Sequence, residues 1–335
     1  MKLLIVLSLV AFCAANEETD AIKLAADNPQ KLQTLFSQFR KENHRVYQNA
    51  VEARMRMGIF RNFIKEAAKV NEEQEDITVG VTFFADLTEE EKVQYHGANV
   101  TEEVGDNVEQ WVASEAPQWG STVSHRSRYG AIKNQGRCGS CWAFGAVGVT
   151  EGFQSMSVGR YTALSEQHVL DCSGAGSCSG GYHVRALNYI RNTNKLASAS
   201  QYRYRGSKSR CSAGNYQNAM QIRVTRIWQA RGDSNLASAI SRGPVAVLLY
   251  NFHGVSVEGY KSGVLKSENH GPRAMNHIVV AVGYTSTYWE LRNSWGSWWG
   301  EQGYFKHDRR KTNNIGVSDY AYTMDVSRAG QEEEE

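Results

Sequence analysis

A cysteine at the start of a helix is the feature that most constrains this chain of 335 residues. Gln135–Phe144 reads QGRCGSCWAF, and a helical pattern follows Cys141 over 142–154. A thiol at a helix N-terminus faces unpaired N–H groups and the positive end of the dipole, which favour the nucleophilic thiolate. We therefore predict that Cys141 is a nucleophile and that the Gln135 amide donates to a developing oxyanion.

The first 15 residues have the pattern of a secretory signal peptide, with a basic Lys2, a short apolar core and small residues before a cut after Ala15. The core is too short to span a bilayer, and no other apolar run reaches that length, so no membrane span is expected. The mature chain would enter the secretory pathway and reach the extracellular space or an acidic, lysosome-like compartment.

Counting cysteines tests the role of Cys141, whose alternative is an ordinary buried or disulfide-bonded residue. Of the six cysteines, Cys13 leaves with the signal peptide, and five remain. An odd number in a secreted protein leaves one free thiol. If Cys141 is that thiol, the other four can pair in three ways, and their positions alone do not choose among them. These four are Cys138, Cys172, Cys178 and Cys211.

Charge divides the chain into two parts. Residues 16–115 hold 11 Lys and Arg against 20 Asp and Glu, whereas 116–335 hold 25 against 15. An acidic leader is therefore expected to dock on a basic body, with carboxylates such as Asp86 losing their partners at low pH. We find no basic stripe with interleaved aromatic residues, so nucleic acid is not an expected partner.

The leader shows two amphipathic helical patterns. The apolar face of the first consists of Leu32, Leu35, Phe36 and Phe39. The second spans roughly 51–70, and its stripe consists of Val51, Met55, Ile59 and Phe63, with Phe60 and Ile64 beside it. Glu52 and Arg56 are four residues apart, the spacing of a helix-surface ion pair.

The rest of the chain changes from helical to strand-like patterns. Ser165 is a predicted N-cap of the helix 166–172, and a later helix, 235–241, is expected to be capped by Asp233 or Ser234. Strands are predicted over 245–250, 278–282 and 288–291. Helices followed by strands indicate an α+β fold rather than an alternating α/β fold.

Three segments in order resemble the papain-like cysteine proteases. Gln135–Phe144 resembles the nucleophile segment of that family, Met275–Tyr284 its histidine strand and Tyr288–Gly296 its asparagine segment. In the leader, the family's propeptide pattern is matched by Glu52, Arg56, Phe60 and Asn71, and by the segment 80–86. The chain is thus similar to a cathepsin L-like protease with an inhibitory propeptide.

The resemblance implies a cysteine endopeptidase made as a secreted zymogen. Cys141 would attack the peptide carbonyl, His277 would pair with it as imidazolium, Asn293 would orient the imidazole, and Gln135 would hold the oxyanion. A thioester acyl-enzyme would follow. No metal or other cofactor is expected, since no cysteine or histidine spacing suggests zinc.

The resemblance also implies the architecture and the disulfides. A helical prodomain would precede a two-lobed fold, with a helical N-terminal lobe and an antiparallel, barrel-like C-terminal lobe. The predicted boundaries are a signal peptide over 1–15, a propeptide over 16–116 and a peptidase over 117–335, with processing between about Val108 and Pro117. The implied disulfides are Cys138–Cys178 and Cys172–Cys211.

Substrate contacts and partners are implied in the same way. Gly181 would pair its backbone with an extended substrate, Tyr182 would wall one pocket, Trp295 would shield the His277–Asn293 contact, and Tyr320 would floor the main specificity pocket. The expected partners of this monomer are polypeptide substrates, its own propeptide and protein inhibitors of cysteine proteases.

Two other functions compete with this interpretation. A catalytically silent relative could serve as a binding protein, but it would not need the four intact catalytic residue types. The tetrapeptide Arg231–Ser234 matches a cell-adhesion motif, which occurs often by chance and is better explained as a turn before a helix.

Overall fold

The computed structural model describes residues 17–99, 108–113, 122–266, 274–310 and 315–329. These residues form two compact units. The first combines the chain up to Lys92 with 253–265 and 298–305, and the second contains 93–252, 266–297 and the residues from Lys306 onward. The predicted signal peptide lies outside the described residues. Within the described ranges, no helix is both long and apolar enough to cross a membrane.

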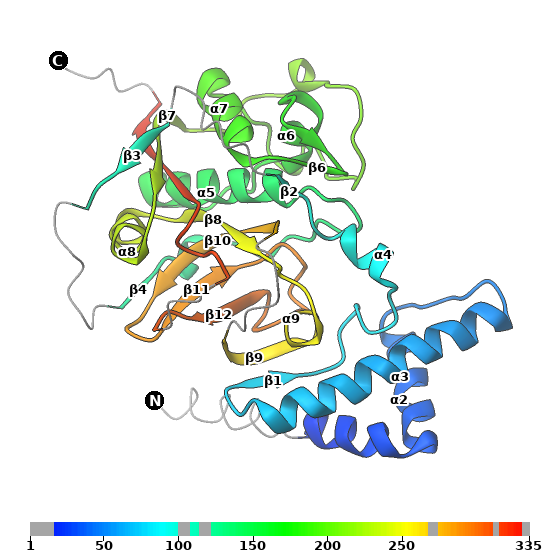
Figure 1. The fold of residues 1–335 in the computed structure, drawn as a ribbon. Helices are drawn as coiled ribbons and strands as arrows, with labels where there is room; N and C mark the ends of the chain where they lie inside the picture. Colours follow the sequence, from blue (N-terminus) through cyan, green and yellow to red (C-terminus); the bar gives the residue numbers. More distant parts are fainter. Residues whose placement is uncertain (1–16, 100–107, 114–121, 267–273, 311–314, 330–335) are drawn as a thin grey trace. The chain divides into compact units, whose positions relative to one another are not determined.

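The first unit is built on helices, as the leader patterns predict (Figure 1). Residues 17–27 are helical, and α2 (Pro29–Glu42) and α3 (Ala50–Glu73) follow. Phe36, Phe39 and Phe60 form an aromatic cluster in which both α2 rings lie 5.1 Å from the Phe60 ring. This cluster confirms the inward face predicted for the first helix.

The predicted stripe on α3 is wrong in its first half. Val51 is 67% exposed and Met55 is 48% exposed, whereas the buried residues begin at Phe60. The inward row continues toward the N-terminus through Arg56 and Glu52, which form the predicted ion pair at 3.5 Å. Arg56 also forms a bidentate pair with Glu91, so a polar contact occupies the place where an apolar one was expected.

A strand of the leader pairs with a segment from late in the sequence. In the first unit, β1 (Ile77–Val79) is antiparallel to β9 (Tyr260–Leu265), which follows the short helix α9 (Val255–Glu258). The Asn71 side chain both donates to and accepts from the backbone of Val79, at 2.8 and 2.7 Å. Asn71 thereby fixes the turn that delivers β1 to its partner.

Asp86 does not pair with the basic body, contrary to the prediction. Its carboxylate lies 3.0 Å from Arg45 and accepts a hydrogen bond from Tyr47, both within the leader. Burial raises the pKa of Asp86. The folded leader therefore binds a proton at Asp86 more readily than the unfolded leader does, so protonation of this group does not favour release of the leader. Between the leader and the 253–265 segment, ion pairs of both senses occur. Lys92 Nζ of the leader lies 2.8 Å from Glu258, whereas Glu18 of the leader lies 3.3 Å from Lys261 Nζ, which is the sense that the charge division predicts.

The helical part of the second unit begins after α4 (Glu89–Val93). It consists of α5 (Cys141–Val158), α6 (Glu166–Cys172) and α7 (His183–Thr193). A small sheet has the order β2 (Ala98–Asn99), β6 (Gly180–Tyr182), β5 (Gly176–Ser177). Ser165 caps α6 as predicted, because its hydroxyl accepts the His168 N–H at 3.0 Å.

Helix α5 is buried along almost its whole length, and its glycines allow close packing. A Cβ added at Gly145 would lie 2.6 Å from the Ile278 side chain, and one at Gly148 would lie 2.9 Å from Val280. Both neighbours belong to the strand that carries His277. The glycines therefore bring the helix of Cys141 directly against that strand.

The larger sheet of the second unit follows the predicted strands. In order, it contains β11 (Tyr288–Arg292), β10 (Met275–Tyr284), β8 (Val245–Tyr250), β13 (Ala321–Arg328), β7 (Ile222–Ala230) and β3 (Glu109–Trp111). β4 (Val123–Ser124) pairs with β10. A further strand, β12 (Tyr304–Asp308), follows β11 in the sequence. All of these pairs are antiparallel except β3–β7. Helices followed by an antiparallel sheet confirm the α+β class.

The predicted cap of the later helix is wrong. α8 (Asp233–Arg242) starts two residues earlier than expected, and its N-cap is Gly232, with no side-chain capping bond. Gly232 has a φ of 84°, a conformation that favours glycine. The Arg231 guanidinium lies 5.0 Å from the Tyr320 ring centroid. The tetrapeptide thus forms a helix start, as the turn interpretation predicted.

Candidate active site

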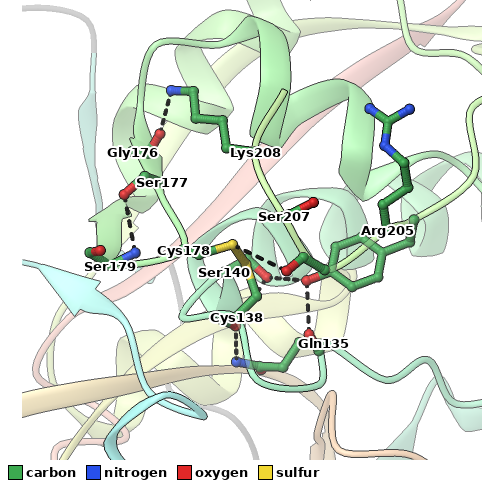
Figure 2. The surroundings of a disulfide bond; sticks show 12 residues. Gln135, Cys138, Ser140, Gly176, Ser177, Cys178, Ser179, Arg205, Ser207 and Lys208 are labelled. Carbon is green, nitrogen blue, oxygen red and sulfur yellow. Dashed lines mark hydrogen bonds between the residues drawn. A yellow bond between two sulfur atoms is a disulfide. The ribbon is translucent and has the colours of Figure 1, made fainter. Parts of the chain in front are cut away.

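Cys141 is the first residue of α5, where the predicted nucleophile should lie. Of the cysteines that the structure describes, it alone is outside a disulfide. The other four form Cys138–Cys178 and Cys172–Cys211, the pairs that the resemblance implies. Figure 2 shows the first of these bonds, which ties the loop before Cys141 to the segment leading into β6.

Gln135 is held in one orientation by contacts on both ends of its amide. Ser294 Oγ donates to Gln135 Oε1 at 2.6 Å, and Gln135 Nε2 donates to the Cys138 carbonyl at 3.0 Å (Figure 2). Tyr204 donates to the Gln135 backbone carbonyl at 2.9 Å. The amide donor is therefore preorganised, and Ser294 is a positioning residue that sequence reasoning did not identify.

His277 and Asn293 are brought together from two adjacent strands. His277 lies in β10, Asn293 follows β11, and His277 Nε2 is 2.8 Å from Asn293 Oδ1. The Ser294 N–H also donates to Asn293 Oδ1, which identifies that atom as an acceptor. The imidazole must therefore carry its proton on Nε2, which leaves the lone pair of Nδ1 available. Nδ1 makes no hydrogen bond to any described residue.

Two aromatic rings enclose the imidazole. The Trp295 ring centroid lies 4.8 Å from that of His277, and the Phe252 ring stacks almost parallel to the imidazole at 5.4 Å. Trp295 is 1% exposed and Phe252 is fully buried. The placement of Trp295 agrees with the shielding that the resemblance implies. Phe252 was missed, since a phenylalanine after a strand has no distinguishing pattern.

A segment of the leader crosses this site. The Tyr95 carbonyl accepts hydrogen bonds from Gln135 Nε2 at 3.0 Å and from Trp295 Nε1 at 3.4 Å. Two residues later, the Gly97 N–H donates to the Asn276 carbonyl at 2.9 Å. A leader carbonyl thus already occupies the donor that was predicted to bind an oxyanion.

The same segment uses the predicted substrate-pairing backbone. The Gly181 N–H donates to the Gly97 carbonyl at 3.0 Å, and β2 runs parallel to β6 with Ala98 opposite Gly181 and Asn99 opposite Tyr182. A Cβ on Gly97 would collide with the backbone of Gly139. Only glycine allows the leader to approach this closely, and the sequence alone did not reveal that role.

Comparison with known proteins settles the family. The papain family cysteine protease model matches residues 118–324, and the cathepsin propeptide inhibitor domain model matches 36–91. The chain belongs to the papain family of cysteine proteases. It is a cysteine endopeptidase made as a zymogen with an inhibitory propeptide domain.

Individual relatives agree with this assignment. Ananain from Ananas comosus is 32% identical over 301 residues, covering 84% of each chain. The digestive procathepsin L 3 of Tenebrio molitor larval midgut has a TM-score of 0.76 at 30% identity and covers 88% of this chain and 98% of its own. The bromelain protease from Ananas comosus, solved in complex with the E64 inhibitor, has a TM-score of 0.57 at 30% identity, with coverages of 63% and 100%.

Burial beneath the leader segment shifts the pKa values of Cys141 and His277 toward their neutral forms. Burial raises the pKa of Cys141 to about 12, although nearby backbone N–H groups act against the increase. Burial also lowers the pKa of His277 to about 4. The thiolate–imidazolium pair is predicted for catalysis; in the covered state, where both side chains are fully buried, burial favours the neutral form of each.

The predicted specificity residues occupy separate places on the protease. Tyr182 is half-buried, and the Arg185 guanidinium lies 4.4 Å from its ring centroid. Tyr320 is also half-buried; its carbonyl accepts the Leu248 N–H at 3.0 Å, and its ring lies beneath Arg231. Gly181 donates its N–H to the leader segment, and Tyr182 lies opposite Asn99 in the same ladder. The pocket roles of Tyr182 and Tyr320 remain predictions.

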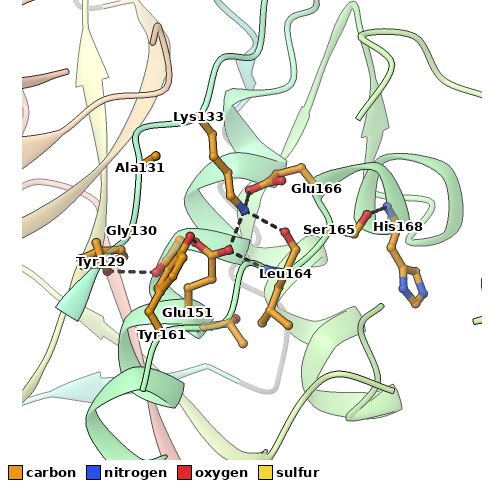
Figure 3. Close-up of polar contacts among 12 residues, drawn as sticks. Tyr129, Gly130, Ala131, Lys133, Glu151, Tyr161, Leu164, Ser165, Glu166 and His168 are labelled. Atoms are coloured by element: carbon orange, nitrogen blue, oxygen red, sulfur yellow. Dashed lines mark hydrogen bonds and ion pairs between the residues drawn. The ribbon is translucent and has the colours of Figure 1, made fainter. Parts of the chain in front are cut away.

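A buried ion cluster supports α5 from the side (Figure 3). Lys133 Nζ lies 2.6 Å from Glu151 Oε1 on α5, 2.5 Å from Glu166 Oε1 on α6 and 2.8 Å from the Leu164 carbonyl. One cation is shared by two carboxylates that are 2% and 3% exposed. The cluster links two helices, and sequence reasoning missed it because its members are far apart in the chain.

The cluster holds more negative than positive charge, so a proton is favoured within it. Burial raises the pKa of Glu166 to about 7, with Lys133 opposing the increase and the charge of Glu151 adding to it.

Among the described residues, no group of three or more histidine, cysteine or acidic side chains is arranged to hold a metal ion.

The neutral thiol of the precursor gives a labelling prediction. Iodoacetamide should react with Cys141 of the precursor slowly at pH 5–8 and faster toward alkaline pH, because the raised pKa keeps the thiol protonated. After removal of the leader, the rate at pH 5 should increase by about tenfold or more, since an exposed thiolate no longer needs alkali. Equal rates at pH 5 before and after removal would contradict the covered, neutral pair.

The Glu166 pKa predicts how stability depends on pH. A folded-state pKa near 7 against an unfolded value near 4.5 means that the folded state binds the extra proton, so this group makes stability fall between pH 4.5 and 7 by up to about 1.4 kcal/mol per pH unit. Glu166→Gln in an inactive Cys141→Ala background should reduce that fall. Thermal melts at several pH values measure it, with the exposed Glu72→Gln as control; identical pH profiles for both variants would refute the assignment.

Proposed function

We propose that Cys141, His277, Asn293 and Gln135 carry out the reaction of this endopeptidase. The observation that carries the proposal is the Tyr95 carbonyl on the Gln135 amide. A peptide carbonyl is the group that the reaction requires at that position, and the donor that receives it is preorganised by Ser294.

The proposed cycle begins when the leader is displaced and the substrate takes its place. Water and an imidazolium neighbour would then lower the pKa of the Cys141 thiol, and the proton would pass to His277 Nδ1, the nitrogen that Asn293 leaves unprotonated. The thiolate attacks the carbonyl carbon of the scissile bond. The oxyanion accepts hydrogen bonds from the Gln135 amide and the Cys141 N–H.

Collapse of the tetrahedral intermediate breaks the C–N bond. His277 gives its proton to the departing amine, which leaves a thioester on Cys141. A water molecule, deprotonated by His277, attacks the thioester through a second oxyanion. The acid product leaves, and the thiolate–imidazolium pair is restored. None of these steps calls on a group from outside the chain other than water and substrate.

We also propose a reason why the leader blocks the site without being cleaved at it. The Tyr95 carbonyl accepts from Trp295, the His96 ring lies 5.5 Å from that of His277, and Ala98 lies opposite Gly181. A substrate would place its acyl side along Gly181 and its leaving amine at His277. The leader segment therefore runs in the direction opposite to a substrate, and its carbonyl is misaligned for attack.

The remaining predictions concern location and partners. We propose that residues 1–15 direct the chain into the secretory pathway, where its disulfides are stable, and that it acts outside the cell or in an acidic compartment. We propose that it acts as a monomer and is blocked by protein inhibitors of cysteine proteases. Similarity to a protease solved with E64 supports using that reagent as a probe.

Peptidase assays on matured protein test the catalytic assignment. Cys141→Ala should lower kcat by about 10⁵-fold or more and abolish labelling by E64. Gln135→Ala should lower kcat by about 10²–10³-fold, because one oxyanion donor is lost. The exposed Gln201→Ala is the matched control. Retained activity in Cys141→Ala, or equal activity in the two glutamine variants, would overturn the assignment.

The proposed pocket floor generates a specificity prediction. Tyr320 would shorten the main pocket, and the Arg231 guanidinium above its ring would repel a cationic side chain. Dipeptide substrates with Leu at the pocket position should therefore be cleaved with a kcat/KM about tenfold or more above those with Arg. Tyr320→Ala should narrow the gap. Comparable kcat/KM values for Leu and Arg substrates in the unmodified enzyme would refute the pocket assignment.

A further inference from the structure

The stretch predicted to contain the processing cut includes a strand of the second unit. β3 (Glu109–Trp111) lies within the range from Val108 to Pro117, which is polar and lacks periodicity. Figure 1 shows it alongside β7 at the edge of the larger sheet. The family match begins at residue 118, beyond this strand.

Trp111 anchors β3 to the sheet. Its side chain is 9% exposed, its ring meets that of Trp228 edge-on at 5.7 Å, and the Arg242 guanidinium lies 5.0 Å from its centroid. The next residue, Val112, is 80% exposed. The alternation of a buried and an exposed side chain is that of a strand with one face on a core.

The backbone and the neighbouring side chains of β3 are also engaged. Glu109, Gln110 and Trp111 stand opposite Trp228, Gln229 and Ala230 in a parallel register. Gln110 Nε2 donates to Gln229 Oε1 at 2.9 Å, and the Ala113 N–H donates to the Asn235 side chain at 3.0 Å. These contacts reach both β7 and α8.

Loss of β3 would uncover the edge of the sheet. β7 would present an unpaired row of N–H and C=O groups, a template for aggregation that proteins usually cover. The Trp228 ring and the aliphatic part of Arg242 would lose their cover as well. Backbone held in a sheet is also a poor protease substrate, because cleavage requires local unfolding first.

We propose that β3 is a permanent strand of the peptidase, so that the cut releasing the leader falls upstream of Val108. The mature chain then begins before β3 and carries Trp111 with it. This inference rests on the proposed function only in requiring that the leader is removed by proteolysis. It moves the boundary predicted at 116/117 toward the N-terminus.

Mass spectrometry of the matured protein tests the proposal directly. The unmodified precursor is matured at acid pH, the product is denatured, and its N-terminus is identified from the intact mass and the N-terminal peptide. A first residue at or before Val108 supports the proposal. A first residue after Trp111 overturns it.

A pair of variants gives a second test. Matured Trp111→Ala should melt about 4 °C or more below matured wild type, because a buried aromatic ring is lost from a domain of this size. Matured Val112→Ala should melt within about 1 °C of wild type. If β3 is removed, the three mature proteins are identical in sequence and must melt together, which would contradict the proposal. Trp111→Phe replaces Trp111→Ala if the latter does not fold.

Labelling with E64 separates this inference from the catalytic assignment. A product that reacts at Cys141 but starts after Trp111 keeps the catalytic assignment and rejects retention of β3. If an added protease is needed for the cut and the product starts before β3 but does not react with E64 at Cys141, the catalytic assignment is wrong and retention of β3 is supported.

Discussion

Covering of Cys141 and His277 by the backbone of residues 95–99 is the interaction on which the state of this protease depends. The leader places a carbonyl on the Gln135 amide and a second carbonyl on the Gly181 N–H. In the proposed function, both donors would bind substrate only when the leader carbonyls have left them. The cover also excludes water, and this burial raises the pKa of the Cys141 thiol and lowers the pKa of the His277 imidazole, so both shifts favour the neutral forms. Inhibition is thus steric and electrostatic at once, and one displacement would relieve both.

The parts of the site are rigid before the substrate arrives. Close packing at Gly145 and Gly148 sets α5 against β10, the Cys138–Cys178 bond tethers the loop before the nucleophile, and the Lys133 cluster joins α5 to α6. The rings of Trp295 and Phe252 pack against the imidazole and against each other. Removal of the leader would therefore change the solvation of a preformed site more than its geometry, which is the arrangement that electrostatic catalysis requires.

The features of the site that depend on local sequence could be predicted, whereas those that depend on contacts between distant residues could not. A cysteine at a helix start, a histidine in an apolar strand and an odd thiol count pointed to Cys141 and His277, and apolar runs located β8 and β10. Asp86 was assigned the wrong partner because net charge does not say which arginine is near. Phe252, Ser294 and the Lys133 cluster act through residues distant in sequence. The sequence predicts a processing cut in the stretch that forms β3, because its single buried residue, Trp111, produces no periodic pattern.

The protonation state of His277 tests the central claim most directly. ¹⁵N NMR of the imidazole at pH 6 should show a neutral ring protonated on Nε2 in the precursor and an imidazolium after the leader is removed. The same spectra of Cys141→Ala show how much of the change in the imidazole depends on the thiolate. That change would establish that the leader inhibits by keeping the pair neutral. An imidazolium already present in the precursor would contradict the account, because the site would then be ionised beneath its cover and only access would be blocked.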